Sequence, residues 1–121
     1  MGFHIESTKK KNIAMIRVEG EVDMFTSPGL RDTLVLYFKN KKVAAVVVDL
    51  AKVSFMDSSG IATLVEGLQW SRKQTRPFVL AGLGDTVYNA LSLTKLDNVF
   101  TIHENADKAF EAVTREKMEE D

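Results

Sequence analysis

A continuous apolar run at residues 43–48, Val-Ala-Ala-Val-Val-Val, constrains the fold more than any other segment of the chain. A strand with one face in solvent alternates apolar and polar residues, whereas this run is apolar at every position. It is also rich in valine, whose β-branched side chain favours extended backbone. The run therefore predicts a strand covered on both faces, as in a parallel sheet with helices above and below.

The segments around this run alternate between strand-like and helix-like patterns. Apolar and polar residues alternate at residues 3–5 and again at 14–18, which predicts a hairpin whose second strand ends at Gly20. Short apolar segments at residues 78–81 and 99–102 predict two further strands. The order of elements predicts an α/β sandwich with a mixed sheet of four or five strands and about four helices.

Four segments carry helical periodicity. The first can be capped by Thr26 or Ser27, the second follows Asp57, the third covers residues 85–93, and the fourth can be capped by Asn105. The expected buried stripe of the second helix consists of apolar residues three to four positions apart: Ile61, Leu64, Val65 and Leu68.

Composition restricts the class of protein. The chain has 121 residues and 45% hydrophobic residues, enough for one domain with a proper core. Its 16 basic and 17 acidic residues leave a net charge of −1, which argues against a direct nucleic-acid binder. The absence of cysteine excludes disulfides and thiolate chemistry and fits a reducing cytoplasm, and no apolar run is long enough to predict a membrane span.

The segment that connects the buried strand to the second helix carries the most informative motif. After Asp49 we expect a short apolar loop, followed by Asp57-Ser58-Ser59-Gly60 at the start of the helix. Free backbone N–H groups at a helix N-terminus favour a side-chain acceptor or an added anion. The local chemistry alone is satisfied if one of these residues is simply the N-cap, and if Gly60 only permits close packing.

Two motifs resemble those of the anti-sigma factor antagonists, a family of bacterial STAS domain proteins. Residues 53–60, Val-Ser-Phe-Met-Asp-Ser-Ser-Gly, are similar to the family signature at the start of the second helix. Residues 20–23, Gly-Glu-Val-Asp, are similar to the family's Gly-Glu-Leu/Val-Asp after the second strand, and the resemblance continues through Val99-Phe100 and residues 109–113. It implies a STAS domain at residues 1–114, followed by a charged tail at 115–121 that we expect to fray.

The resemblance also implies a function. Ser58 corresponds to the residue that a partner anti-sigma factor serine kinase phosphorylates, and a separate serine phosphatase would reset it. The unphosphorylated protein would bind the kinase and release a sigma factor, as a cytoplasmic binding module rather than an enzyme. Asp23 and Asp57 match family positions around this serine, so the expected partner-binding residues include Asp23, Asp57, Ser58, Ser59 and Gly60. We expect no cofactor, no metal, no direct nucleic acid and no membrane partner.

One position departs from the family pattern. Residues 94–96 are Thr-Lys-Leu where the family usually has Thr-Gly-Leu, so Lys95 must adopt left-handed backbone or end the third helix differently.

Trp70 stands nine residues after Ile61, half a revolution away at about 100° per residue, and is expected to face outward. It would then be partly covered by a neighbouring loop, or would serve as a sixth partner-binding residue.

Two alternatives remain open from the sequence. The first is a STAS subunit of another signalling or lipid-transport assembly that uses the same helix face. The second is a small enzyme that uses Ser58 with His103, or that binds a nucleotide at residues 82–85, Gly-Leu-Gly-Asp. The enzyme is disfavoured because Ser58 lies in no Gly-x-Ser-x-Gly elbow and the glycine-rich loop lacks its third glycine.

Overall fold

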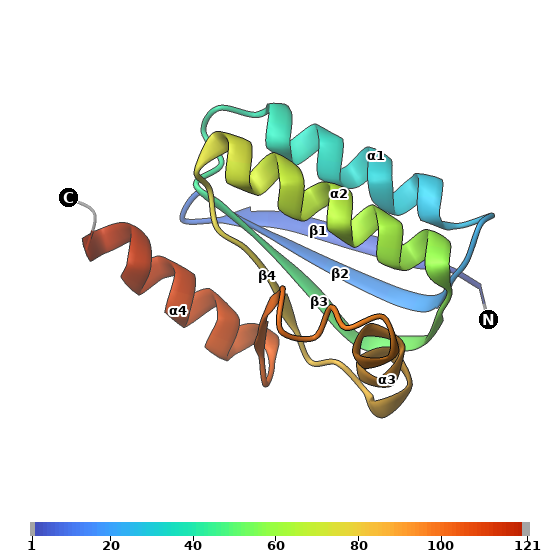
Figure 1. Cartoon of the computed structure of the whole chain (residues 1–121). Coiled ribbons are helices and arrows are strands. Elements are labelled where there is room, and N and C mark those ends of the chain that lie inside the picture. Colours follow the sequence, from blue (N-terminus) through green and yellow to red (C-terminus); the bar gives the residue numbers. More distant parts are fainter. Residues whose placement is uncertain (1, 120–121) are drawn as a thin grey trace.

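The computed structural model describes residues 2–119, and its sheet has five strands in the order β1-β2-β3-β4-β5 (Figure 1). The hairpin strands β1 and β2 are antiparallel, and all other neighbours are parallel. The strands are β1 (His4–Lys10), β2 (Ile13–Val22), β3 (Ala45–Met56), β4 (Phe78–Ala81) and β5 (Thr101–His103), and the helices are α1 (Ser27–Lys39), α2 (Ser58–Gln74), α3 (Asp85–Leu93) and α4 (Ala106–Glu119). The predicted mixed sheet with four helices is confirmed.

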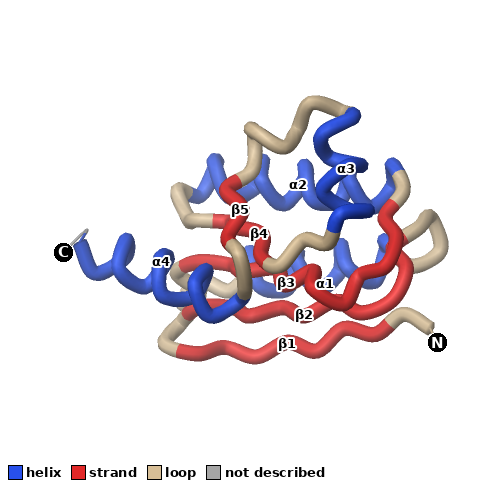
Figure 2. Tube along the Cα trace, turned by 90° about the horizontal axis from the view of Figure 1, so that it is seen from below, coloured by secondary structure: helices blue, strands red, loops and turns tan. Residues whose placement is uncertain are grey.

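The central strand β3 is covered on both faces, as its unbroken apolar sequence predicts. Val46 and Val48 are fully buried in the core shared with α1 and α2. Ala45 and Val47 are fully buried in a second core, to which α4 contributes Ala109. Figures 1 and 2 show these two layers, with α1 and α2 on one side of the sheet and α4 on the other. The helix α3 joins the first core through its buried residues.

The two long strands run further than the sequence pattern indicates. Strand β2 continues past Gly20 to Val22, because Gly20 adopts a φ of +99° at a point where the register against β3 shifts. A side chain at Gly20 would lie 2.5 Å from the carbonyl oxygen of Gly2, so this close approach requires glycine. Pairing with β2 keeps β3 extended to Met56, and the loop expected after Asp49 is therefore wrong.

Small residues join large apolar ones on the buried side of α2. Its most buried face includes Gly60, Gly67 and Ser71, which the expected apolar stripe omits. A Cβ atom at Gly67 would come within 2.8 Å of the Phe78 ring, so the helix lies very close to the sheet there. The expected stripe itself faces the core: Ile61 and Leu64 are buried, and Val65 and Leu68 are partly buried against the same cluster.

The packing of α2 against α1 sets the environment of Trp70. The indole packs edge-on against Phe38 of α1, with ring centroids 5.9 Å apart, and the Arg31 guanidinium lies 5.5 Å from its ring centre. Trp70 is therefore half-buried, and its expected outward orientation is wrong. Its partial cover comes from the neighbouring helix α1 instead of a loop.

The last two helices begin and end largely as their sequences indicate. Lys95 adopts the left-handed backbone expected at the end of α3, with φ +61°. The Asn105 side chain accepts a hydrogen bond from the Lys108 N–H at 2.9 Å, which confirms it as the cap of α4. Because α4 extends to Glu119, residues 115–119 belong to this helix; the remaining residues of the expected tail, 120–121, lie outside the described residues, and the fraying stays a prediction.

The position of Trp70 against Phe38 predicts a moderate loss of stability on truncation. We expect Trp70→Ala to lower the free energy of unfolding by about 2 kcal/mol, less than a fully buried tryptophan would cost. Leu36→Ala, on the exposed side of α1, is the control and should change it by less than about 0.5 kcal/mol. Denaturant titration measures both, and equal stabilities for Trp70→Ala and Leu36→Ala would contradict the packing of Trp70 between the helices.

Candidate functional site

Asp57 caps the N-terminus of α2 and organises the residues around it. Its Oδ1 atom accepts hydrogen bonds from the backbone N–H groups of Ser59 at 2.9 Å and Gly60 at 3.3 Å. The same oxygen accepts a hydrogen bond of 2.6 Å from the Ser59 hydroxyl. The capping alternative that the sequence left open therefore applies to Asp57, and the hydroxyl of Ser59 is engaged by that cap.

Ser58 differs from Ser59 in both exposure and hydrogen bonding. It is the first residue of α2 and is exposed, whereas Ser59 is half-buried. Within residues 2–119, the Ser58 hydroxyl has no hydrogen-bond partner, because the cap occupied by Asp57 uses Ser59 and Gly60. Of the two adjacent serines, Ser58 is thus the one whose oxygen is free to react with an approaching molecule.

The electrostatic state of Asp57 follows from these donors. The hydrogen bond from the Ser59 hydroxyl lowers the pKa of Asp57 below its ordinary value, and partial desolvation opposes this. Backbone N–H groups of Gly60, Ser59 and Met24 also favour the ionised form and lower the pKa. Asp57 is consequently a carboxylate at neutral pH, directly beside Ser58.

The loop between β2 and α1 is held in one shape by Asp23. The Asp23 carboxylate accepts hydrogen bonds from the backbone N–H groups of Phe25 at 2.9 Å and Thr26 at 3.1 Å. Thr26 takes the N-cap position of α1, as expected, but its hydroxyl donates to the Glu21 carbonyl at 2.9 Å instead of capping the helix. Asp23 is therefore occupied mainly within its own loop.

A backbone hydrogen bond joins the end of β2, just before this loop, to the start of α2. The Asp57 N–H donates to the Val22 carbonyl at 3.0 Å. The sequence motifs that contain Asp23 and Asp57 are thus brought together at one end of the sheet. Gly60 lies beneath them, buried against Met56 and Val22, where a Cβ would have contacts as short as 2.6 Å. Gly60 therefore packs into the core side of the site and presents no side chain at its surface.

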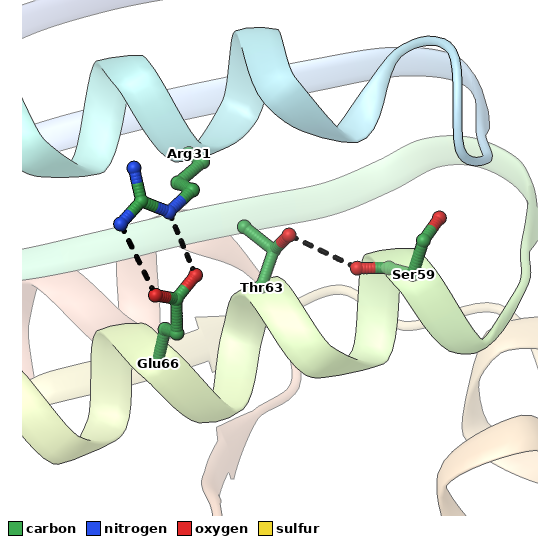
Figure 3. A network of polar contacts seen from close by, with 4 residues as sticks. All are labelled: Arg31, Ser59, Thr63 and Glu66. Atoms are coloured by element: carbon green, nitrogen blue, oxygen red, sulfur yellow. Dashed lines mark hydrogen bonds and ion pairs between the residues drawn. The ribbon is translucent and has the colours of Figure 1, made fainter.

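Trp70 does not belong to this cluster. It lies twelve residues after Ser58 along α2, about 18 Å away at 1.5 Å per residue. It lines a separate groove with residues of α1 such as Val35 and Phe38. Figure 3 shows how α1 and α2 are joined near this groove, by the ion pair between Arg31 and Glu66 at 2.9 Å. In the same view, the Thr63 hydroxyl donates to the Ser59 carbonyl at 3.0 Å.

Three exposed apolar side chains, which the sequence motifs do not single out, lie near the ends of β2 and β3 where α2 begins. Met24 is 67% exposed, Phe25 is 84% exposed, and Phe55, the penultimate residue of β3, is 42% exposed. A usable signal was present, since Met-Phe follows Asp23 in a segment with no helical or strand periodicity that would bury it.

The enzymatic alternatives gain no support from the described residues. Gly82 adopts a φ of +72° beside Ala51, and Gly84 is the N-cap of α3, so this segment is a tight turn between β4 and α3. His103 lies on β5, and no hydrogen bond is formed between it and Ser58. Among the described side chains, residues 2–118, there is no group of three or more acidic or histidine side chains suited to a metal ion. In the same range, none of the helices has both the length and the apolar character required to cross a membrane.

Comparison with known proteins agrees with this geometry. Residues 4–109 match the family described as STAS domain. The chain is 32% identical to an anti-sigma-B factor antagonist of Listeria monocytogenes over 87 residues, which are 72% of this chain and 75% of the relative. The chain therefore belongs to the STAS domain family, among the anti-sigma factor antagonists.

Solved structures of similar fold include two further proteins. An anti-sigma factor antagonist from Mycobacterium paratuberculosis superposes with a TM-score of 0.84 at 26% identity, over 93% of this chain and 95% of that one. The anti-sigma factor antagonist SpoIIAA in its unphosphorylated form superposes with a TM-score of 0.79 at 19% identity, over 93% and 96% of the two chains. The phosphorylated form of SpoIIAA matches with a TM-score of 0.72 at 19% identity, over 93% and 99%.

The lowered pKa of Asp57 predicts a pH-dependent contribution of the cap. Because the folded-state pKa lies below the unfolded value of about 4, the ionised carboxylate stabilises the fold above that value, and this stabilisation is lost as the pH falls through the folded pKa. We expect wild type to melt above Asp57→Asn at neutral pH, with a difference that shrinks below about pH 4. Ser59→Ala should raise the Asp57 pKa in an NMR titration; an unchanged pKa would contradict the role of the hydroxyl.

Proposed function

We propose that this anti-sigma factor antagonist binds an anti-sigma factor serine kinase while Ser58 is unphosphorylated, and that phosphorylation of Ser58 ends the complex. The observation that carries the proposal is the exposed, unbonded hydroxyl of Ser58 at the first residue of α2. The chain belongs to the anti-sigma factor antagonists, and this supports an anti-sigma factor as its partner. While it is bound to this chain, the kinase would leave its sigma factor free. After phosphorylation of Ser58 the released kinase would bind the sigma factor again.

The fold can accept a phosphate at Ser58 without rearrangement. Phosphoserine adds about −1.5 to −2 charges, and the N-terminus of the helix favours an anion there by about 0.3–1 kcal/mol. The Ser58 hydroxyl donates no hydrogen bond that the phosphate would break within the described part of the chain. The added group therefore changes the surface rather than the core.

The same phosphate would disrupt a close interface. The ionised Asp57 is already negative at this site, so a partner that fits both side chains has to bury a second anion after phosphorylation. An unpaired charge in an interface costs about 2–5 kcal/mol, which corresponds to roughly 30- to 4000-fold in affinity. This range is large enough for a binding switch that works by local charge alone.

The exposure of Ser58 also bears on reset of the switch. A phosphate at an exposed helix N-terminus stays accessible to a serine phosphatase, which supports a cycle with two opposing enzymes. Both enzymes and their substrate would meet in the cytoplasm, which is where sigma factors act. A regulatory binding role requires no catalytic residue from this chain.

Phosphate is expected on Ser58 and not on Ser59. The Ser59 hydroxyl donates to Asp57 and is half-buried, whereas that of Ser58 is free. Mass spectrometry after incubation with ATP and each purified anti-sigma factor kinase of the source organism should map one phosphate to Ser58. Ser59→Ala should still be phosphorylated and Ser58→Ala should not; phosphate on Ser59 alone in wild type would overturn the assignment.

Binding to the kinase should depend on charge at residue 58. We expect Ser58→Ala to bind like wild type and to be insensitive to ATP, and Ser58→Asp to bind more weakly by roughly 10-fold or more, because one charge is added beside Asp57. Aspartate carries less charge than phosphoserine, so the phosphorylated protein should bind weakest. Isothermal titration with the kinase measures the series, with thermal melts as a control that the variants remain folded. Equal affinities across the series would contradict the charge switch.

A further inference from the structure

The loop between β2 and α1 presents two adjacent large apolar side chains to solvent. Met24 is 67% exposed and Phe25 is 84% exposed, in a chain whose other large apolar residues mostly lie in two cores. A single exposed apolar side chain is ordinary, but a contiguous exposed pair at the tip of a loop is typical of a binding surface. Aromatic residues in particular supply large contact areas at low entropic cost.

The tip is held in place rather than free to collapse onto the surface. The Asp23 carboxylate accepts hydrogen bonds from the N–H groups of Phe25 and Thr26, and the Thr26 hydroxyl accepts one from the Asp23 N–H at 2.9 Å. The Asp23 carbonyl also accepts a hydrogen bond of 2.7 Å from the Ser27 N–H. These bonds are made by the backbone around Met24 and Phe25, so the exposed conformation of both side chains is already organised before binding.

The tip is also joined to the phosphorylation site. The Asp57 N–H donates at 3.0 Å to the carbonyl of Val22, the last residue of β2 and two residues before Met24. Asp57 immediately precedes Ser58. The tip and Ser58 therefore lie at the same end of the sheet, where a single partner can contact both.

We propose that Met24 and Phe25 dock in an apolar pocket of the same anti-sigma factor kinase that phosphorylates Ser58. This inference rests on the proposed function and adds the apolar anchor of the complex. Asp23 is then a positioning residue, which acts by shaping the tip and not by offering its charge to the partner. The apolar contacts of Met24 and Phe25 supply binding affinity, and phosphorylation of Ser58 prevents the complex from forming.

The anchor is tested by truncation with a matched control. Phe25→Ala should weaken binding of the unphosphorylated chain to the kinase by roughly 10- to 100-fold, and Met24→Ala by a smaller factor, because apolar surface no longer enters the pocket. Met118→Ala is the control, since Met118 is 71% exposed in α4. Figure 1 shows that the C-terminal end of α4 and the loop between β2 and α1 lie at opposite sides of the molecule. Met118→Ala should bind like wild type, and all three variants should melt like wild type because the removed atoms lie in solvent.

The role of Asp23 is tested by a pair of substitutions. Asp23→Asn keeps the Oδ1 acceptor for the Phe25 and Thr26 N–H groups and removes the charge. Asp23→Ala removes both. We expect Asp23→Asn to retain most of the wild-type affinity and Asp23→Ala to lose about as much as Phe25→Ala. Equal losses for both would show that the charge itself contacts the kinase and would overturn the positioning role.

The outcomes separate this inference from the proposed function. If Phe25→Ala and Met24→Ala bind like wild type while Ser58→Asp binds weakly, the apolar anchor is wrong and the switch at Ser58 stands. If wild type binds none of the purified kinases, the proposed function fails and the anchor fails with it. A loss confined to Phe25→Ala and Met24→Ala, with Met118→Ala unaffected, supports the anchor.

Discussion

Burial of β3 on both faces is the constraint on which the other elements depend. Val46, Val47 and Val48 are fully buried, and consecutive side chains of a strand point to opposite faces. The strand is therefore stable only if α1 and α2 cover one face and α4 covers the other. A parallel arrangement of β2, β3 and β4 follows, because each return crossing is made by one of these covering helices.

The direction of β3 also explains where the functional residues lie. The strand ends at Met56, and the chain enters α2 at once through Asp57. The end of β2 is paired beside it, so the loop that contains Asp23 is brought to the same edge. A site made of a capped helix N-terminus and a tight loop is rigid, which suits a switch in which an added charge changes the surface while the fold stays the same.

Predictions from the sequence failed where the environment of a residue depends on how closely two helices or strands pack together. The stripe on α2 was drawn from apolar residues, but the closest approach to the sheet is made by Gly60 and Gly67, whose lack of a side chain permits it. On the same helix, Trp70 packs against Phe38 of α1, a contact between two helices that the pattern of one helix does not contain. The sequence pattern predicts that the strand ends at Gly20, whereas the positive φ of Gly20 allows a bulge through which pairing continues.

Local sequence alone determined the order and kind of elements, the buried central strand and the helix start at Asp57, because periodicity and capping are encoded within a few neighbouring residues. It also marked Ser58 and Ser59 as candidates without separating them on chemical grounds. Only the tertiary structure separated them, since the cap geometry engages the Ser59 hydroxyl and leaves that of Ser58 in solvent. The tertiary structure likewise decided that the segment of Met24 and Phe25 and the start of α2 lie at the same end of the sheet, because the pairing of β2 with β3 brings together segments more than thirty residues apart.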